Sequence, residues 1–370
     1  MTVLNIPSAL KFVVTSPVLF GAVITDAFVR RRAKSEKGNT MTHVLVVGTG
    51  RMAGLRIPHL VHAGLDLTIT GRDVDRAAQV ASQFGVSSIE IARAQRGRYD
   101  AVIITSASAD HEADLRSFAD RAPVIFCEKP VATSSIVARD LQVVLANAGT
   151  EVYVGFQRRF DPAFVSARKA IAAGTLGQLF QVAGAHLDHT PSRPEFTAHS
   201  GGTFKDMLIH DIDCLLWTTG LEVRSLFATG TVIADEQYRK LGDCDTVAVT
   251  LVLGDGTVAI LRGSRVHPTG QDIRMEFLGS TGTLSAGLTR NTPIHSVEGD
   301  LPLHQKPVPQ DFIDRFQPAF SSETRQFASY LTGEAESFEG CTLDEAIRAL
   351  EIAEDCTLSW TTQKLISYNG

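Results

Sequence analysis

Residues 43–54 read HVLVVGTGRMAG, a short apolar and β-branched run that ends in a glycine-rich turn. The run predicts a buried strand, and the residues from Leu55 to Ala63 have the apolar periodicity of a helix. A strand, a G-x-G turn and a helix in this order are typical of a dinucleotide-binding fold.

Each small residue of this turn has a distinct expected role. Gly48 permits the tight turn, and Gly50 lets the backbone approach a pyrophosphate without a Cβ in the way. Ala53 keeps the contact between helix and strand close. The start of the helix, including Arg51 and Met52, is expected to present free N–H groups to the phosphates. The stretch therefore predicts the phosphate site of a nucleotide cofactor.

The alternation of strands and helices continues to about residue 164, where the composition of the segments changes. Further strands are expected at 65–70, 100–105 and 124–127, and helices at 74–84 and 134–147. Strands that alternate with helices imply a parallel sheet covered on both faces. Residues 41–164 are therefore predicted to form a doubly wound Rossmann domain.

Residues 165–370 are predicted to form a second domain of different architecture. Strand-like alternation without crossover helices suggests a large, open and mainly antiparallel sheet. The α/β domain so formed is expected to hold the substrate and the contacts of a homo-oligomer, and its C-terminal helix can pack back on the Rossmann domain. The expected strands are 179–186, 223–232, 246–253, 257–264 and 273–278, and the expected helices are 202–219, 321–331 and 343–363.

Composition restricts the function further. A net charge of -6 with interspersed signs argues against a nucleic-acid partner. The five scattered cysteines form no CxxC pair, which argues against disulfides or a metal site and fits the cytoplasm. Residues 1–40 are interpreted as an N-terminal extension. A membrane anchor at residues 12–29 is disfavoured by Asp26, although the length of the apolar stretch leaves it open.

The end of the second expected strand bears on the choice of cofactor. Residues 70–73 read TGRD, with Gly71 where NAD enzymes usually place a carboxylate for the ribose. Arg72 can pair with the 2′-phosphate of NADP, so NADP is favoured. In the alternative register Asp73 binds the ribose of NAD and Arg72 is solvated. Both cofactors therefore stay open, with NADP preferred.

Four further motifs carry a family resemblance. They are EKP at 128–130, GFQRRFDP at 155–162, SGGTFKDMLIHDID at 200–213 and FIDRF at 312–316. In this order they resemble the glucose–fructose oxidoreductase/inositol dehydrogenase/MocA (Gfo/Idh/MocA) family, most closely its inositol 2-dehydrogenase branch. The resemblance runs from about residue 42 to the last helix.

The resemblance implies a Rossmann domain, a substrate domain and a set of site residues. It places Lys129, Asp206 and His210 as catalytic residues around the carbon that exchanges hydride with the nicotinamide. Further expected cofactor contacts are Ser106, His111, Glu128 and Lys129, and the expected substrate contacts are Lys129, Arg158, Asp188, His189, Asp206 and His210.

The chemistry of these residue types agrees with this implication. Oxidation of an alcohol requires a base, and His210 can serve near neutral pH. Asp206 lies four residues earlier, so an α-helix would bring it to the same face, where it can orient the ring or a substrate hydroxyl. Lys129 can donate or relay the proton. The alternative is an ordinary helix pair beside a surface lysine.

Two departures from the family pattern concern the substrate. Residues 106–111 read SASADH where the family commonly has TPTxxH, and Leu187 stands where the inositol branch often has arginine. We therefore expect an NAD(P)-dependent oxidoreductase acting on a secondary alcohol or ketone of a cyclitol or sugar-like polyol. The alternatives are a lyase with an internal NAD redox cycle and a non-catalytic NADP-binding regulator.

Overall fold

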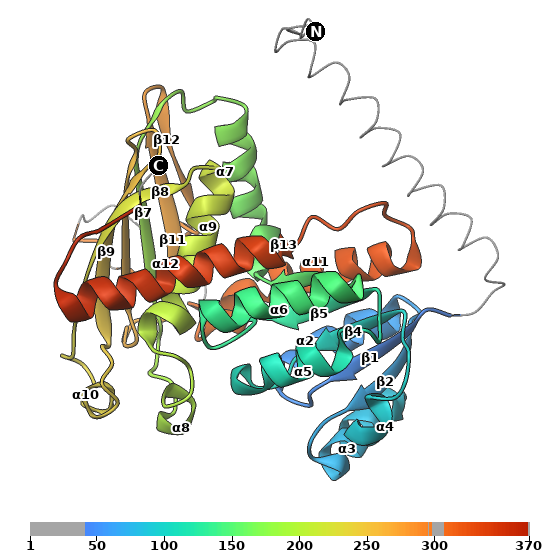
Figure 1. Ribbon diagram of the computed structural model, residues 1–370. Coiled ribbons are helices and arrows are strands. Elements are labelled where there is room, and N and C mark those ends of the chain that lie inside the picture. The colour runs from blue at the N-terminus through green and yellow to red at the C-terminus, as the bar shows by residue number, and fades with distance from the viewer. Residues whose placement is uncertain (1–40, 295, 298–306, 369–370) are drawn as a thin grey trace, which may run out of the picture. The chain divides into compact units, whose positions relative to one another are not determined.

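The apolar run that follows Thr42 forms β1 (His43–Val47), which lies between two parallel neighbours in the first of two seven-stranded sheets. The computed structural model describes residues 41–294, 296–297 and 307–368. The predicted extension at 1–40 lies outside them. Figure 1 shows the chain from His43 onward as two sheets with helices packed against them.

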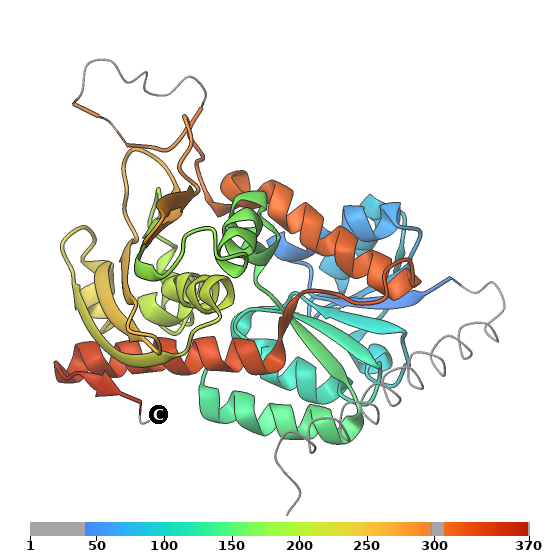
Figure 2. The same ribbon diagram turned by 90° about the horizontal axis from the view of Figure 1, so that it is seen from above.

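The first sheet confirms the predicted Rossmann architecture. Its strand order is β13-β6-β5-β4-β1-β2-β3, and all pairs are parallel except β13 with β6. Figure 2 shows α11 on one side of this sheet and α6 on the other. Its elements are β2 (Asp66–Thr70), β3 (Ser87–Ser88), β4 (Ala101–Ile104), β5 (Val124–Glu128), β6 (Glu151–Gly155) and β13 (Cys341–Thr342), with α2 (Arg51–His62), α3 (Val74–Phe84), α4 (Ile91–Ala94), the 3-10 turn η1 (Ser108–Asp110), α5 (His111–Phe118) and α6 (Ser135–Ala148).

The second sheet confirms the predicted open and mainly antiparallel arrangement. Its order is β12-β11-β7-β10-β9-β8-β14, and the pair β7–β10 is parallel. The strands are β7 (Leu179–Leu187), β8 (Val223–Thr231), β9 (Thr246–Leu253), β10 (Val258–Ser264), β11 (Asp272–Gly279), β12 (Gly282–Ala286) and β14 (Ile366–Ser367). The helical segments are η2 (Gln157–Phe160), α7 (Pro162–Ala172), α8 (Pro194–Thr197), η3 (Phe204–Leu208), α9 (Ile209–Thr219), α10 (Gln237–Lys240), α11 (Phe312–Thr332) and α12 (Leu343–Thr362).

The parallel pair places two polar residues side by side. Leu187 lies opposite Ser264 at the carboxyl ends of β7 and β10. The next residues, Asp188 and Arg265, therefore leave the sheet at the same edge. This is also the edge at which the functional side chains described below converge.

The C-terminal segments connect the two sheets. β13 pairs with β6 of the first sheet, α11 packs on α2, and α12 contacts both α6 and β8. Helix α11 starts at Phe312, nine residues before the predicted start at Ser321, and continues through Pro318 with Asp311 as its N-cap. Within the described residues, no helix has the length and apolarity needed to cross a membrane.

A buried ion cluster attaches α11 to the first sheet. The guanidinium of Arg56 on α2 donates to Glu128 at 2.6 Å and to Glu323 on α11 at 2.8 Å. It also lies 4.2 Å from the ring centroid of Phe126. Burial raises the pKa of Glu323 to about 7, an effect that Arg56 opposes and Glu128 reinforces. The cluster therefore holds a carboxyl group that titrates near neutral pH.

This titration predicts a pH-dependent stability. The unfolded chain releases the Glu323 proton near pH 4.5 and the folded chain near pH 7, so the folded state binds more protons between these values. The free energy of unfolding should therefore fall as pH rises through this window, by at most about 3 kcal/mol. Glu323→Gln cannot ionise and should lack this fall. Urea unfolding at several pH values measures both proteins, and parallel curves would contradict the assignment.

Candidate active site

The glycine turn after β1 has no room for a larger first residue. Gly48 has φ +114°, and its N–H donates to the carbonyl of Thr70 on β2 at 2.8 Å. A Cβ built on Gly48 would lie 2.7 Å from the backbone nitrogen of Ser106, which follows β4. The close approach arises because β1 lies between β2 and β4. Gly48 is thus required by the protein's own packing.

Gly50, by contrast, is not required by the protein's own packing. A Cβ on Gly50 would meet nothing within 4 Å among the described residues. Gly50 is the N-cap of α2 and supplies no side-chain cap, so the first N–H groups of this helix are available to a ligand. A free helix N-terminus beside open space fits the pyrophosphate of a dinucleotide. Ala53 is fully buried under the turn and Met52 is half-buried.

Arg51, the first residue of α2, pairs with a residue from the C-terminal part of the chain. Its guanidinium forms an ion pair with Asp311 and lies 5.3 Å from the ring centroid of Phe312. The start of α11 therefore lies beside the predicted phosphate site, and Arg51 has its charge satisfied there.

Arg72 follows β2, where the sequence places the ribose of the adenosine. Its side chain is 49% exposed, and its two terminal nitrogens each lie 3.2 Å from a carboxylate, one of Asp110 and one of Asp114. Asp73 accepts from the backbone N–H of Arg76 and caps α3. Arg72, the candidate for the 2′-phosphate of NADP, and Asp73, the candidate for the ribose of NAD, therefore both lie just after β2. Each already has a partner within the protein.

Ser106 and His111 connect neighbouring turns at the carboxyl edge of the first sheet. The Ser106 hydroxyl donates to Asp114 at 2.5 Å. The His111 ring is 1% exposed, with Nδ1 2.7 Å from the carbonyl of Pro130 and Nε2 3.0 Å from the carbonyl of Ser106. His111 thus lies beneath the predicted cofactor site and ties the turn after β4 to the turn that carries Lys129.

Glu128 and Lys129 are adjacent in the chain but face opposite ways. Glu128 points to Arg56 in the buried cluster beneath α2, away from the predicted cofactor edge. Lys129 follows β5, and its Nζ donates to the Asp206 carboxylate at 3.0 Å and to the Asp206 carbonyl at 2.7 Å. The structure therefore brings together two of the three predicted catalytic residues, one from the turn after β5 and one from η3.

The second oxygen of Asp206 pairs with a residue that the sequence analysis did not identify. Arg265 Nη2 lies 2.9 Å from Asp206 Oδ2, and Arg265 Nη1 lies 3.3 Å from Asp188 Oδ2. Burial alone would raise the pKa of Asp206, but Lys129 and Arg265 bring it below its ordinary value. Asp206 is therefore an ionised carboxylate at neutral pH.

Asp206 and the His210 ring form no hydrogen bond among the described residues, so the expectation that Asp206 orients this ring gains no support. The other expected role of Asp206, orienting a substrate hydroxyl, stays a prediction. Residues Phe204–Leu208 form a π-helical turn, and α9 starts only at Ile209. The Asp206 carboxylate instead faces Lys129 and Arg265.

The His210 ring packs against the aromatic ring of Phe156 and lies among cationic side chains. Its ring centroid is 5.6 Å from that of Phe156, in an edge-on geometry, and 6.4 Å from that of His186. Burial lowers the pKa of His210 well below its ordinary value, and Lys129 and Arg158 lower it further. The Nδ1 atom is buried and has no partner among the described residues. At neutral pH His210 is a neutral imidazole that can accept a proton.

Arg158, a predicted substrate contact, lies behind the site. It is 1% exposed, and its guanidinium lies 2.7 Å from Asp211 and 2.8 Å from His186 Nδ1. Burial would lower the pKa of His186, but Asp211 brings it above its ordinary value. The two predicted substrate contacts Asp188 and Arg158 are therefore linked through His186, which lies 3.4 Å from Asp188.

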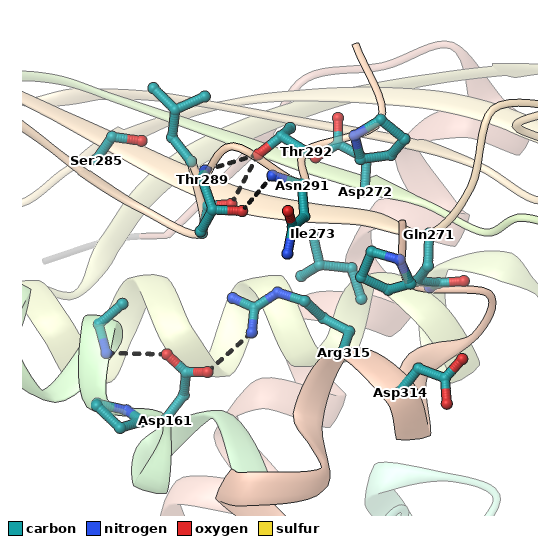
Figure 3. Close-up of a pocket in the computed structure, with 16 residues that line it drawn as sticks. Asp161, Gln271, Asp272, Ile273, Ser285, Thr289, Asn291, Thr292, Asp314 and Arg315 are labelled. Atoms are coloured by element: carbon teal, nitrogen blue, oxygen red, sulfur yellow. Dashed lines mark hydrogen bonds and ion pairs between the residues drawn. The ribbon is translucent and has the colours of Figure 1, made fainter. Parts of the chain in front are cut away.

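Gln271 joins the site to a neighbouring hollow. Its amide donates to Asp188 at 2.8 Å and accepts from the backbone of His189 at 3.1 Å. On its other side it lines a hollow of about 410 Å³ between β11, the segment after β12 and the start of α11 (Figure 3). Figure 3 shows Arg315 of α11 reaching toward Asp161 at the floor of this hollow. Gln271 thus belongs both to the candidate site and to the lining of the hollow.

Arg265, His186 and Gln271 are the site residues that sequence analysis missed. Arg265 directly follows a strand, as Lys129 does, and that position was the available signal. In an antiparallel pair of strands, Arg265 and Asp188 would leave the sheet at opposite edges. Only the parallel pairing of β7 with β10 brings the two together.

The whole chain from Thr42 on resembles known oxidoreductases. Residues 42–156 match the model of an oxidoreductase family with an NAD-binding Rossmann fold. Residues 164–285 match the GFO/IDH/MocA C-terminal domain.

Individual relatives include cyclitol enzymes. An inositol 2-dehydrogenase of Rhizobium meliloti (strain 1021) is 32% identical over 268 residues, or 72% of this chain and 80% of the relative. The scyllo-inositol 2-dehydrogenase (NAD(+)) of Bacillus subtilis (strain 168) is 31% identical over 76% of this chain and 84% of the relative. The solved myo-inositol dehydrogenase of Corynebacterium glutamicum ATCC 13032 has a TM-score of 0.79 at 25% identity and covers 90% of this chain and 100% of that structure.

The two glycines of the turn should respond differently to alanine. Gly48→Ala should lower the melting temperature, because its Cβ meets the backbone at Ser106 and its φ is positive. Gly50→Ala should leave the melting temperature unchanged but weaken NAD binding by roughly tenfold or more, because its Cβ fills the phosphate space. Thermal unfolding and NAD titration by calorimetry measure the two effects. Unchanged NAD affinity in Gly50→Ala would remove the phosphates from this turn.

Proposed function

The chain belongs to the Gfo/Idh/MocA family of NAD-binding oxidoreductases, and we propose that its substrate is a secondary alcohol of a cyclitol or related polyol. The observation that carries the proposal is the ion pair of Lys129 with Asp206 at the edge of the cofactor domain, with the neutral His210 ring close enough to feel the Lys129 charge. The cyclitol dehydrogenases among the relatives support the substrate class.

His210, Lys129 and Asp206 have different roles in the proton transfer that accompanies alcohol oxidation. His210, held neutral, takes the hydroxyl proton, and the Lys129 ammonium donates to the substrate oxygen and stabilises its developing negative charge. Asp206 fixes Lys129 through two contacts. Bound NAD supplies the redox chemistry by accepting the carbinol hydride, so that the alcohol becomes a ketone, NAD⁺ becomes NADH and one proton is released. In the reverse direction the same residues return the proton.

The other groups at the edge of the second sheet suit a ligand rich in hydroxyls. Asp188, His189 and Gln271 lie together there, and the hollow beyond Gln271 adds further hydroxyl and amide groups. Rings with several hydroxyls need several such partners. We therefore assign substrate contacts to Asp188 and His189, with Arg158 supporting them from behind.

The sequence favours NADP through Gly71 and Arg72, but the contacts of Arg72 point to NAD, which we propose as the cofactor. The NAD-binding domain model establishes the class of cofactor. Asp110 and Asp114 occupy both terminal nitrogens of Arg72, and a 2′-phosphate placed there would also meet these two carboxylates. This contact favours NAD over NADP.

The proposed roles predict two inactive variants. Lys129→Met and His210→Ala should each lower kcat by roughly 10²- to 10⁴-fold, because each removes one partner in the proton transfer. NAD affinity should hardly change. The measurement is NADH formation across a panel of cyclitols, other polyols and ketosugars, tested with NAD and NADP side by side.

The control is Lys205→Met, since Lys205 is an exposed neighbour whose ammonium donates to the carbonyl of Thr133. Its turnover should match that of the unchanged enzyme. Wild-type turnover in Lys129→Met would contradict the assigned role. Product without net NADH would instead support the lyase alternative, and tight NAD binding without turnover across the panel would support the regulator.

We also propose that the enzyme forms a homo-oligomer through the second sheet. Helices α7, α9 and α12 pack on one face, and Figure 1 shows the opposite face without a helix among the described residues. Phe227, Ile260 and Leu278 are partly exposed on β8, β10 and β11 of this sheet. Five of the strands have 7–9 residues, β12 has 5 and β14 has 2. At a spacing of about 4.8 Å the sheet spans roughly 800 Å², the area that one partner of a stable dimer buries. A second copy of the chain fits this face.

Ile260→Asp tests the oligomer. It places a charge on β10, the strand with three others on each side, and should reduce the mass measured by light scattering after gel filtration. Ile136→Asp, at an isoleucine that is 82% exposed on α6, is the matched control and should leave the mass unchanged. An unchanged mass in Ile260→Asp, or a monomeric wild type, would refute this interface.

The five cysteines and the net charge support the remaining proposals. All five cysteines are buried free thiols, which suits the reducing cytoplasm, where we place the enzyme. A net charge of -6 gives no basis for a nucleic-acid partner.

A further inference from the structure

Arg265 lies where three site-forming segments meet. It directly follows β10 and is 4% exposed. Its guanidinium contacts Asp206 at 2.9 Å, Asp188 at 3.3 Å and the Thr203 hydroxyl at 3.4 Å. Its own N–H donates to the carbonyl of Asp245 at 2.8 Å. The guanidinium is therefore held from behind and directed at two carboxylates of the site.

We propose that Arg265 is the positioning residue of the active site, which aims Asp206 at Lys129 and whose positive charge helps keep His210 neutral. This inference rests on the proposed function, because it assigns to Arg265 an effect on the two residues that handle the proton. Arg265 itself does not need to touch the substrate.

The first part of the proposal follows from the geometry of Asp206. One oxygen of its carboxylate accepts from Arg265 and the other from Lys129. A rigid guanidinium fixes the plane of the carboxylate, and so fixes the direction of the oxygen that holds Lys129. A lysine at this position has one nitrogen and cannot span both Asp206 and Asp188 in the same planar way. Arginine is therefore the residue type that this geometry requires.

The second part follows from the charges around His210. The cations that act on His210 are Lys129, Arg158, His186 and Arg265. The groups next to His186 and Arg265 are the carboxylates Asp188, Asp206 and Asp211 and the buried phenol of Tyr238. Burial lowers the pKa of His210 first, and each of the four cations lowers it further. Loss of the Arg265 charge must therefore raise the pKa of His210.

A second buried arginine provides the comparison. Arg159 pairs with Asp213 through two contacts of 3.1 and 2.6 Å and is 5% exposed. Within the described residues, neither Arg159 nor Asp213 forms a hydrogen bond or ion pair with Lys129, Asp206 or His210. Its loss should therefore destabilise the fold in the manner of a broken buried pair without changing the proton chemistry.

The test compares Arg265→Gln, Arg265→Lys and Arg159→Gln. Arg265→Gln should lower kcat on the order of 10²-fold because Lys129 is misplaced, and should move the acidic limb of the alcohol-oxidation pH profile to higher pH. Arg265→Lys loses the planar guanidinium, so it should lower kcat. It keeps the positive charge, so the acidic limb of its pH profile should stay at the wild-type pH. Arg159→Gln should keep the wild-type limb whatever its stability.

NMR titration of the His210 ring, assigned with His210→Asn, reads the same shift in the absence of turnover. An unshifted His210 titration in folded Arg265→Gln would overturn the electrostatic part, and wild-type kcat in Arg265→Lys would overturn the positioning part. Should Arg265→Gln fail to fold, Arg265→Lys alone decides the positioning part. A wild type that oxidises no polyol refutes the proposed function, whereas the titration still tests Arg265.

Discussion

The ion pair between Lys129 and Asp206 is the interaction on which the site depends. Lys129 leaves the first sheet at the end of β5, and Asp206 lies in a π-helical turn that packs against the second sheet. Both charges are largely removed from water, which is unfavourable unless every charge has a partner. Asp206 meets this requirement with Lys129 on one oxygen and Arg265 on the other. The two halves of the protein are thereby held in the relation that the chemistry needs.

The same requirement explains why the two charges at the end of β5 join separate networks of buried ions. Glu128 and Lys129 follow one another at the end of β5, and successive residues of an extended segment point to opposite sides. Glu128 therefore joins Arg56 and Glu323 beneath α2, while Lys129 joins Asp206 and the second sheet. The first network attaches α11 to the Rossmann sheet, and the second joins the end of β5 to the second domain. The EKP motif thus combines one structural carboxylate with the ammonium that we propose takes part in the reaction.

Much of the first domain could be predicted because its signals are local. The residues that start and end β1, the glycine turn and helix α3 lie within or next to these segments in the sequence. Strands that alternate with helices in a parallel sheet also have few possible topologies. Strand β6 and the first turns of α11 were missed. Strand β6 lies beside β5 in space, and α11 continues through Pro318 because Asp311 caps it and α2 supports it. Those stabilising contacts are distant in sequence.

The glycine turn and the cofactor class could be predicted from the sequence alone, because the residues of the turn are adjacent in the chain. The catalytic roles of Lys129, Asp206 and His210 are what the family resemblance implies and stay a proposal. The partners of those residues were decided only by the tertiary structure. Asp206 pairs with Lys129 and Arg265, and the parallel pairing of β7 with β10 brings Arg265 beside Asp188. Neither feature has a local signal, since each depends on which strand or side chain, far along the chain, becomes the neighbour.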